Sequence, residues 1–96
     1  MTEKEEIMSY PFLTLDDNTE ITHSELLSDG SVRVTVEKPV YRDFHTATCV
    51  LPSYEWQDVR GFTDGELDGF RKMIANSAHL IMRYAEKGGF LNAEGF

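Results

Sequence analysis

The chain has 96 residues, 41% of them hydrophobic and 27% charged, a composition that suits one globular domain with a modest core. Seventeen acidic residues outnumber nine basic ones, which gives a formal charge of −8. This balance disfavours direct binding to nucleic acid, because affinity for phosphates comes largely from cationic side chains. A single cysteine, Cys49, excludes an intrachain disulfide.

The N-terminal segment is acidic where a secretory signal would be basic, and no apolar stretch follows it. We therefore expect residues 1–8 to form a flexible acidic leader, residues 9–96 to form a single domain, and the protein to be cytoplasmic. The longest uncharged run in the C-terminal half, residues 73–82, has about half the length of a membrane span. No association with a membrane is expected.

The first half of the chain has the pattern of short strands. Residues 12–15 are an apolar run that ends in a turn-forming cluster, and residues 19–27 form a plausible strand with polar groups on both sides. Residues 31–37 are the clearest strand, because valines alternate strictly with polar residues. Pro39 lacks a backbone donor and is expected to end that strand, and residues 41–51 resume extended structure.

Short links at residues 28–30 and 38–40 favour antiparallel pairing of neighbouring strands. The prediction is an antiparallel three- to four-stranded β-meander over about residues 12–51. Residues 52–62 follow as an aromatic-rich connection. This connection either carries a helical turn around residues 55–59 or wraps the edge of the core.

The clearest local signal marks the start of a helix over about residues 64–87. Thr63 and Glu66 have the spacing of a capping box, and Phe62 and Leu67 occupy the hydrophobic-staple positions. The Gly-Gly pair at 88–89 is suited to a C-terminal cap. The fold class is therefore α+β, with the meander packed against one long C-terminal α-helix.

The apolar residues of this helix span an arc of roughly 200° at about 100° per residue, wider than the ~100° that covers one sheet face. Three groups are candidates for covering the surplus: the aromatics of residues 52–62, a C-terminal apolar tail, or a second copy of the protein. The tail contains Phe90, Leu91 and Phe96.

The histidines and the cysteine are the first place to look for catalytic or metal chemistry. His45 and Cys49 share a strand face but lie about 13 Å apart along it, and His23 has no partner at metal-ligand spacing, although it could sit across a hairpin from His45. Cys49 falls in an apolar stretch typical of a buried residue, and His79 lies in a polar helix stripe that a partner could contact. No catalytic set, metal site, cofactor or small-molecule substrate is predicted.

The function predicted from these patterns is that of a small non-catalytic intracellular interaction protein, which binds another protein or forms a homodimer. Aromatic and large apolar side chains are the favoured anchors of such interfaces. The candidate partner-binding residues are Tyr54, Trp56, Phe62, Met73, Leu80 and Tyr84.

The alternative rests on the distribution of charge. Residues 1–30 carry a net charge of −7 and residues 53–69 carry −4, while the remaining segments are slightly basic. If these two segments meet, they form an acidic surface. Such a surface suits an inhibitor that resembles DNA and binds the basic groove of a nucleic-acid-processing enzyme.

Overall fold

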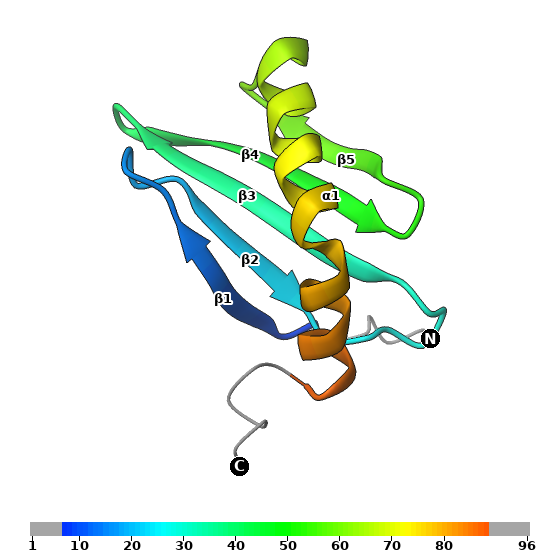
Figure 1. The fold of residues 1–96 in the computed structure, drawn as a ribbon. Coiled ribbons are helices and arrows are strands. Elements are labelled where there is room, and N and C mark those ends of the chain that lie inside the picture. The colour runs from blue at the N-terminus through cyan, green and yellow to red at the C-terminus, as the bar shows by residue number, and fades with distance from the viewer. Residues whose placement is uncertain (1–6, 89–96) are drawn as a thin grey trace, which may run out of the picture.

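The alternating valines lie in the central strand of an antiparallel sheet. The computed structural model describes residues 7–88, in which five strands follow one another in the sheet in chain order and one helix comes after them (Figure 1). These elements are β1 Ser9–Thr14, β2 Glu20–Ser24, β3 Val32–Val40, β4 Asp43–Leu51, β5 Glu55–Arg60 and α1 Asp64–Glu86. The predicted α+β meander with one long C-terminal helix is confirmed, with one strand beyond the three to four expected.

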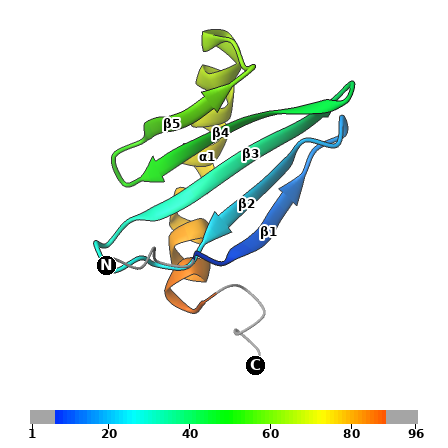
Figure 2. The same ribbon diagram turned by 180° about the vertical axis from the view of Figure 1, so that it is seen from behind.

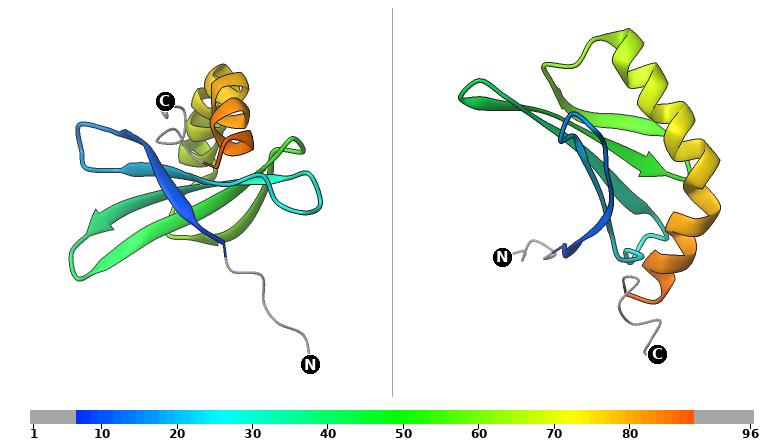
Figure 3. Two further views of the ribbon diagram at one scale, coloured as in Figure 1. Left: turned by 90° about the horizontal axis from the view of Figure 1, so that it is seen from below. Right: turned by 60° about the vertical axis from the view of Figure 1, so that its left-hand side comes forward.

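The core lies between one face of the sheet and α1. In β3 the side chains of Val32, Val34 and Val36 are fully buried, and the residues paired with them in β4 are also buried. Directly paired residues of an antiparallel sheet project from the same face, so these two strands supply most of the sheet's core face. The helix crosses that face, as the two views in Figure 3 show, and it contributes Ile74 and Ile81 to the core.

The opposite face of the sheet is polar, and no helix of residues 7–88 covers it (Figure 2). Its centre is a row of threonines, in which Thr35 pairs with Thr22 on one side and with Thr48 on the other. The hydroxyls of Thr35 and Thr48 lie 3.3 Å apart. The alternation read from the sequence therefore separates a buried face from a hydrated one.

The helix begins and ends where the sequence indicates. The Thr63 side chain accepts a hydrogen bond from the Glu66 amide at 3.1 Å, and the Glu66 carboxylate accepts one from the Thr63 amide at 2.9 Å, so the capping box is confirmed. Gly88 follows the last turn with φ of 74°, a left-handed conformation that glycine adopts without strain. Its amide donates to the Ala85 carbonyl at 3.0 Å.

The prediction that Pro39 ends its strand was wrong, because β3 continues to Val40 and Pro39 pairs with Phe44. The reason is local. The ladder between β2 and β3 ends at the pair of Glu20 with Glu37, so β3 has β4 as its only strand neighbour beyond that point. A missing donor that points to the free side breaks no pairing, which is the condition under which sheets tolerate proline.

Of the two alternatives for residues 52–62, the helical turn around residues 55–59 was wrong, since those residues belong to β5. Trp56 pairs with Cys49 and packs against the core. The pairing of β4 with β5 is irregular, with a register shift between Thr46 and Thr48 and a left-handed residue, Asp58, at φ of 55°. This bulge interrupts the two-residue period by which strands are recognised.

Residues 1–6 of the expected leader and residues 89–96, with the apolar tail, lie outside the described residues. Of the surplus apolar arc of α1, Phe70, Met73, Ala78 and Met82 pack against the core. Leu80 is the large apolar residue of the helix that remains exposed. Among residues 7–88, no helix combines the length and the apolarity that crossing a membrane requires.

Candidate functional site: an apolar groove between β1 and α1

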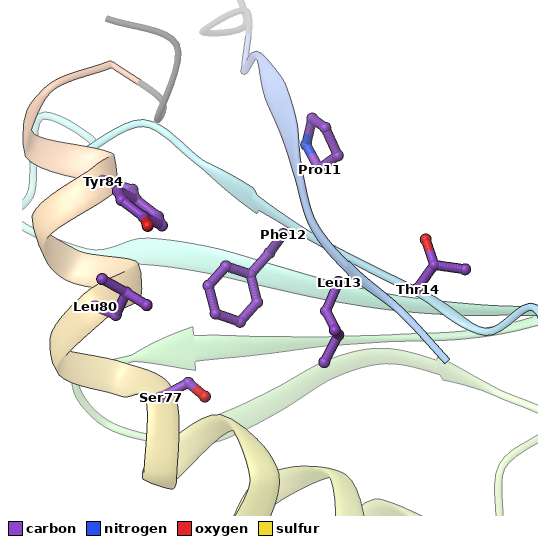
Figure 4. A pocket seen from close by; sticks show the side chains of 7 residues that line it. All are labelled: Pro11, Phe12, Leu13, Thr14, Ser77, Leu80 and Tyr84. Atoms are coloured by element: carbon purple, nitrogen blue, oxygen red, sulfur yellow. The ribbon is translucent and has the colours of Figure 1, made fainter. Parts of the chain in front are cut away.

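An open groove runs between the edge strand β1 and the C-terminal half of α1, with a volume of about 580 Å³. This volume is within the range of binding sites for drug-sized ligands, about 300–1,000 Å³. Figure 4 shows the Phe12 ring directed from β1 toward the helix, where Ser77, Leu80 and Tyr84 face it. The lining residues are Pro11, Phe12, Leu13, Thr14, Ser77, Leu80 and Tyr84.

The β1 wall of the groove depends on a bulge. Tyr10 pairs with His23, and Leu13 pairs with Ile21, but the register shifts between Pro11 and Leu13, so Phe12 is the additional residue. Both His23 and Ile21 belong to the buried face. The bulge therefore places Leu13, in addition to Tyr10 and Phe12, on the side of the sheet that faces α1.

The floor of the groove is aromatic and its rim is aliphatic. Phe12 and Tyr84 are half-buried and lie with ring centroids 6.3 Å apart. Leu13 and Leu80, one from each wall, remain 40% and 39% exposed. Both walls thus present an apolar side chain to solvent over a packed aromatic base, the arrangement expected of a binding groove rather than of a closed core.

His23 lies beneath this floor and supports it. The imidazole is 1% exposed, and its Nδ1 lies 2.8 Å from the Ser24 carbonyl oxygen, to which it donates. It stacks on Tyr84 at 6.3 Å and lies 6.4 Å from Phe12 and 5.7 Å from Tyr10. His23 thus contacts both floor side chains, Phe12 and Tyr84, and restricts their rotation.

The structure separates the six residues that the sequence nominates for partner binding. Leu80 and Tyr84 lie in the groove. Trp56 and Met73 are partly buried against the core, and Phe62 is 8% exposed. Phe62 packs edge-on against Phe70, with ring centroids 5.0 Å apart. Tyr54 lines another pocket, between the β4–β5 turn and α1, beside Asp68, Arg71 and Lys72.

Sequence reasoning did not nominate Phe12, Leu13 or Ser77. A signal for the first two was present, since Phe12 and Leu13 are apolar at consecutive positions, which a strand with one buried face does not require. Ser77 carries no such signal, because its position in the groove follows from the angle at which α1 crosses the sheet.

The groove lies on a protein whose acidic residues gather elsewhere. Lys38 lies 3.7 Å from the Asp17 carboxylate, and its charge also contributes to lowering the pKa of Glu66. The charge of Lys38 thus acts on one carboxylate of the β1–β2 turn and on one at the start of α1. Two of these acidic residues also have a local role: a hydrogen bond from Thr19 lowers the pKa of Asp17, and one from the Thr63 amide lowers that of Glu66.

The residues with reactive or metal-binding potential do not converge. His23 is in register with Val34 and, through it, with Cys49, whereas His45 pairs with Lys38 four positions further along β4. Among residues 7–88, no group of three His, Cys, Asp or Glu side chains is arranged to hold a metal ion. Burial raises the pKa of Cys49 to about 11.

Comparison with known proteins covered family models, curated proteins and solved structures, and none of them matches this chain.

Proposed function

We propose that this protein is a non-catalytic interaction module that binds a partner polypeptide in the groove between β1 and α1. The observation that carries the proposal is the pair of exposed leucines, Leu13 and Leu80, set on opposite walls over a fixed aromatic floor. Contiguous exposed apolar surface on a small soluble domain is typical of an interaction site. The other large exposed apolar residues of the described chain do not line this groove: Met8, Leu26, Tyr41, Phe44 and Val59.

The partner binds by burying side chains rather than by adding a strand to the sheet. Within residues 7–88 no strand pairs with the outer edge of β1, but Pro11 lacks a donor and the bulge at Phe12 interrupts the regular spacing of backbone groups. Both features are ones by which natural sheets protect their edges from additional strands.

The proposal is tested by comparing Leu80→Asp with Val59→Asp. Both residues are about equally exposed, at 39% and 43%, but Val59 lies on β5 at the opposite edge of the sheet. The immobilised proteins are exposed to an extract of the native host, and each captured polypeptide is quantified. Leu80→Asp should lose the partner while Val59→Asp retains it. Equal capture by both variants, with equal thermal stability, would refute the groove as the binding surface.

Self-association is the second form that this function can take, with the groove of one copy binding another copy. Sedimentation equilibrium over a wide range of protein concentration separates the two forms. A homodimer that dissociates in the Leu80→Asp variant makes a second copy the occupant, as an isologous interface requires. A wild-type monomer at all concentrations leaves a different polypeptide as the partner.

A second candidate function, inhibition of a nucleic-acid-processing enzyme, is supported by the acidity of the two segments, 1–30 and 53–69. Lys38 lies 3.7 Å from the Asp17 carboxylate of the first segment, and its charge contributes to lowering the pKa of Glu66 in the second. Binding through these segments would be electrostatic and would weaken steeply with salt, because surface charges are screened. Capture that depends on Leu80 and survives about 1 M salt, where the screening length is about 3 Å, would exclude this candidate.

A further inference from the structure

The helical wall of the groove has a basic margin. From Ser77, the first helix residue that lines the groove, to Gly88, the chain contains two bases, Arg83 and Lys87, and one acid, Glu86. Arg83 is three residues after Leu80, and Lys87 is three residues after Tyr84, so each lies beside a lining residue on the helix surface. Glu86 is about 120° around the helix from Leu80 and therefore faces away from the groove.

The opposite wall adds no negative charge. The β1 residues that line the groove are all uncharged. The next acids along the chain are Asp16 and Asp17, and Asp17 already bonds the Thr19 amide and pairs with Lys38. An apolar groove with a basic margin thus exists on a protein whose overall charge is −8.

The charge of Arg83 is not neutralised by a carboxylate among residues 7–88. Asp17, Asp43 and Asp68 form their ion pairs with bases other than Arg83. Arg83 instead lies 3.2 Å from the Nε2 of His79, to which its guanidinium donates. A guanidinium fixed by a neutral neighbour is well placed to receive a carboxylate, because it keeps its full charge and most of its donors.

We infer that the groove takes a partner segment in which apolar side chains are flanked by aspartate or glutamate. The apolar side chains fill the space between Leu13, Leu80 and the Phe12–Tyr84 floor, and the carboxylates lie over Arg83 and the last turn of α1. This inference rests on the proposed function and adds the chemistry of the partner. Charges at the margin of an interface mainly set selectivity and the rate of association, so we expect about fivefold to tenfold tighter binding of an acidic segment than of its basic counterpart.

The inference is tested by selecting a displayed library of random dodecapeptides on the full-length protein at low salt. Selections on Leu80→Asp and Arg83→Glu run in parallel. Arg42→Glu is the matched control, because it makes the same change of charge at the β3–β4 turn, away from the groove. The strongest peptide is then synthesised, together with a version in which Lys replaces each acidic residue, and both affinities are measured by calorimetry.

We expect the enriched peptides to be apolar with a net negative charge, to require Leu80, and to bind better than their Lys versions by a factor that shrinks at high salt. Arg83→Glu should reverse this preference, and Arg42→Glu should leave it in place. Peptides that require Leu80 but are neutral or basic would overturn the inference while leaving the proposed function intact. If no enriched peptide depends on Leu80, the proposed function fails as well.

Two further measurements, the oligomeric state of wild type and Leu80→Asp and the peptide affinity of a variant without residues 89–96, distinguish two other occupants. If wild-type protein is a dimer that Leu80→Asp dissociates, the occupant is a second copy and the inference is overturned. If removal of residues 89–96 strengthens peptide binding tenfold or more, the chain's own C-terminal segment competes for the groove, and the inference of an external acidic partner is overturned in the same way. Unchanged affinity after that removal supports it.

Discussion

Gly61 and Gly30 form a matched pair of sites at which one added methyl group separates two physical effects. Both residues have left-handed backbones, with φ of 90° and 85°. A Cβ on Gly30 would meet nothing within 4 Å, whereas a Cβ on Gly61 would overlap the imidazole of His45. Gly30→Ala should therefore report backbone strain alone, about 1–2 kcal/mol. Gly61→Ala should add the displacement of a packed ring, which brings a further ~1–3 kcal/mol.

The displaced ring is part of the junction between β4 and α1, because His45 packs edge-on against Phe62 at 5.6 Å. Urea unfolding followed by the fluorescence of Trp56, the single tryptophan, measures the free energy of unfolding of each variant. In a His45→Ala background the clash is gone, so Gly61→Ala should then cost no more than Gly30→Ala. Equal losses for the two glycine variants in the wild-type background would refute this reasoning.

The remaining predictions concern the helix cap, acid stability and the buried thiol. Thr63→Ala removes the capping box and should lower the free energy of unfolding by about 1 kcal/mol; an unchanged urea midpoint would show that the cap contributes nothing. The Phe44 amide and, secondarily, Arg60 lower the pKa of Asp43 from 3.8, so its contribution to stability is complete above pH 3.8 and is lost as the pH falls through the lowered folded pKa. Asp43→Asn should therefore reduce the loss of stability in that acid range, and an identical pH profile would contradict this assignment. Cys49 is fully buried, and burial raises its pKa to about 11. A thiol reagent at pH 8 should therefore modify Cys49 only in denaturant. Rapid labelling of the native protein would place the thiol outside the core.

The parts of the fold that follow local rules could be read from the sequence. Val32, Val34 and Val36 alternate without interruption, and the capping box at Thr63 and Glu66 is a local hydrogen-bonding motif. Each requires only neighbours in the chain, so the start of the main strand and both ends of the helix were predicted close to their observed bounds.

The parts that were missed depend on pairing between strands. Pro39 is tolerated because the ladder between β2 and β3 ends before it. The strand β5 was not recognised because the bulge near Asp58 interrupts its alternating pattern. Neither condition is visible in a single segment, because each depends on the length or register of a neighbouring strand. A strict two-residue period is too narrow a criterion for strands that contain bulges.

The candidate site was half predictable for the same reason. Leu80 and Tyr84 belong to a helix arc too wide for one sheet face, and the sequence identified them on that basis. Their counterparts Phe12 and Leu13 face the helix because of a bulge in β1, which becomes visible only in the register with β2. The residue pattern of the helix therefore predicted an uncovered apolar surface. The register of β1 with β2 determines that this surface forms one wall of a groove.

Site-specific photocrosslinking at position 80 tests the central claim most directly. A photoreactive amino acid replaces Leu80 in one protein and Val59 in another, and each is irradiated in an extract of the native host. The groove account predicts one dominant covalent adduct at position 80 that is absent at position 59 and disappears when Phe12 is changed to Asp in the same chain. Adducts of equal yield at both positions, or an adduct at position 59 alone, would contradict it.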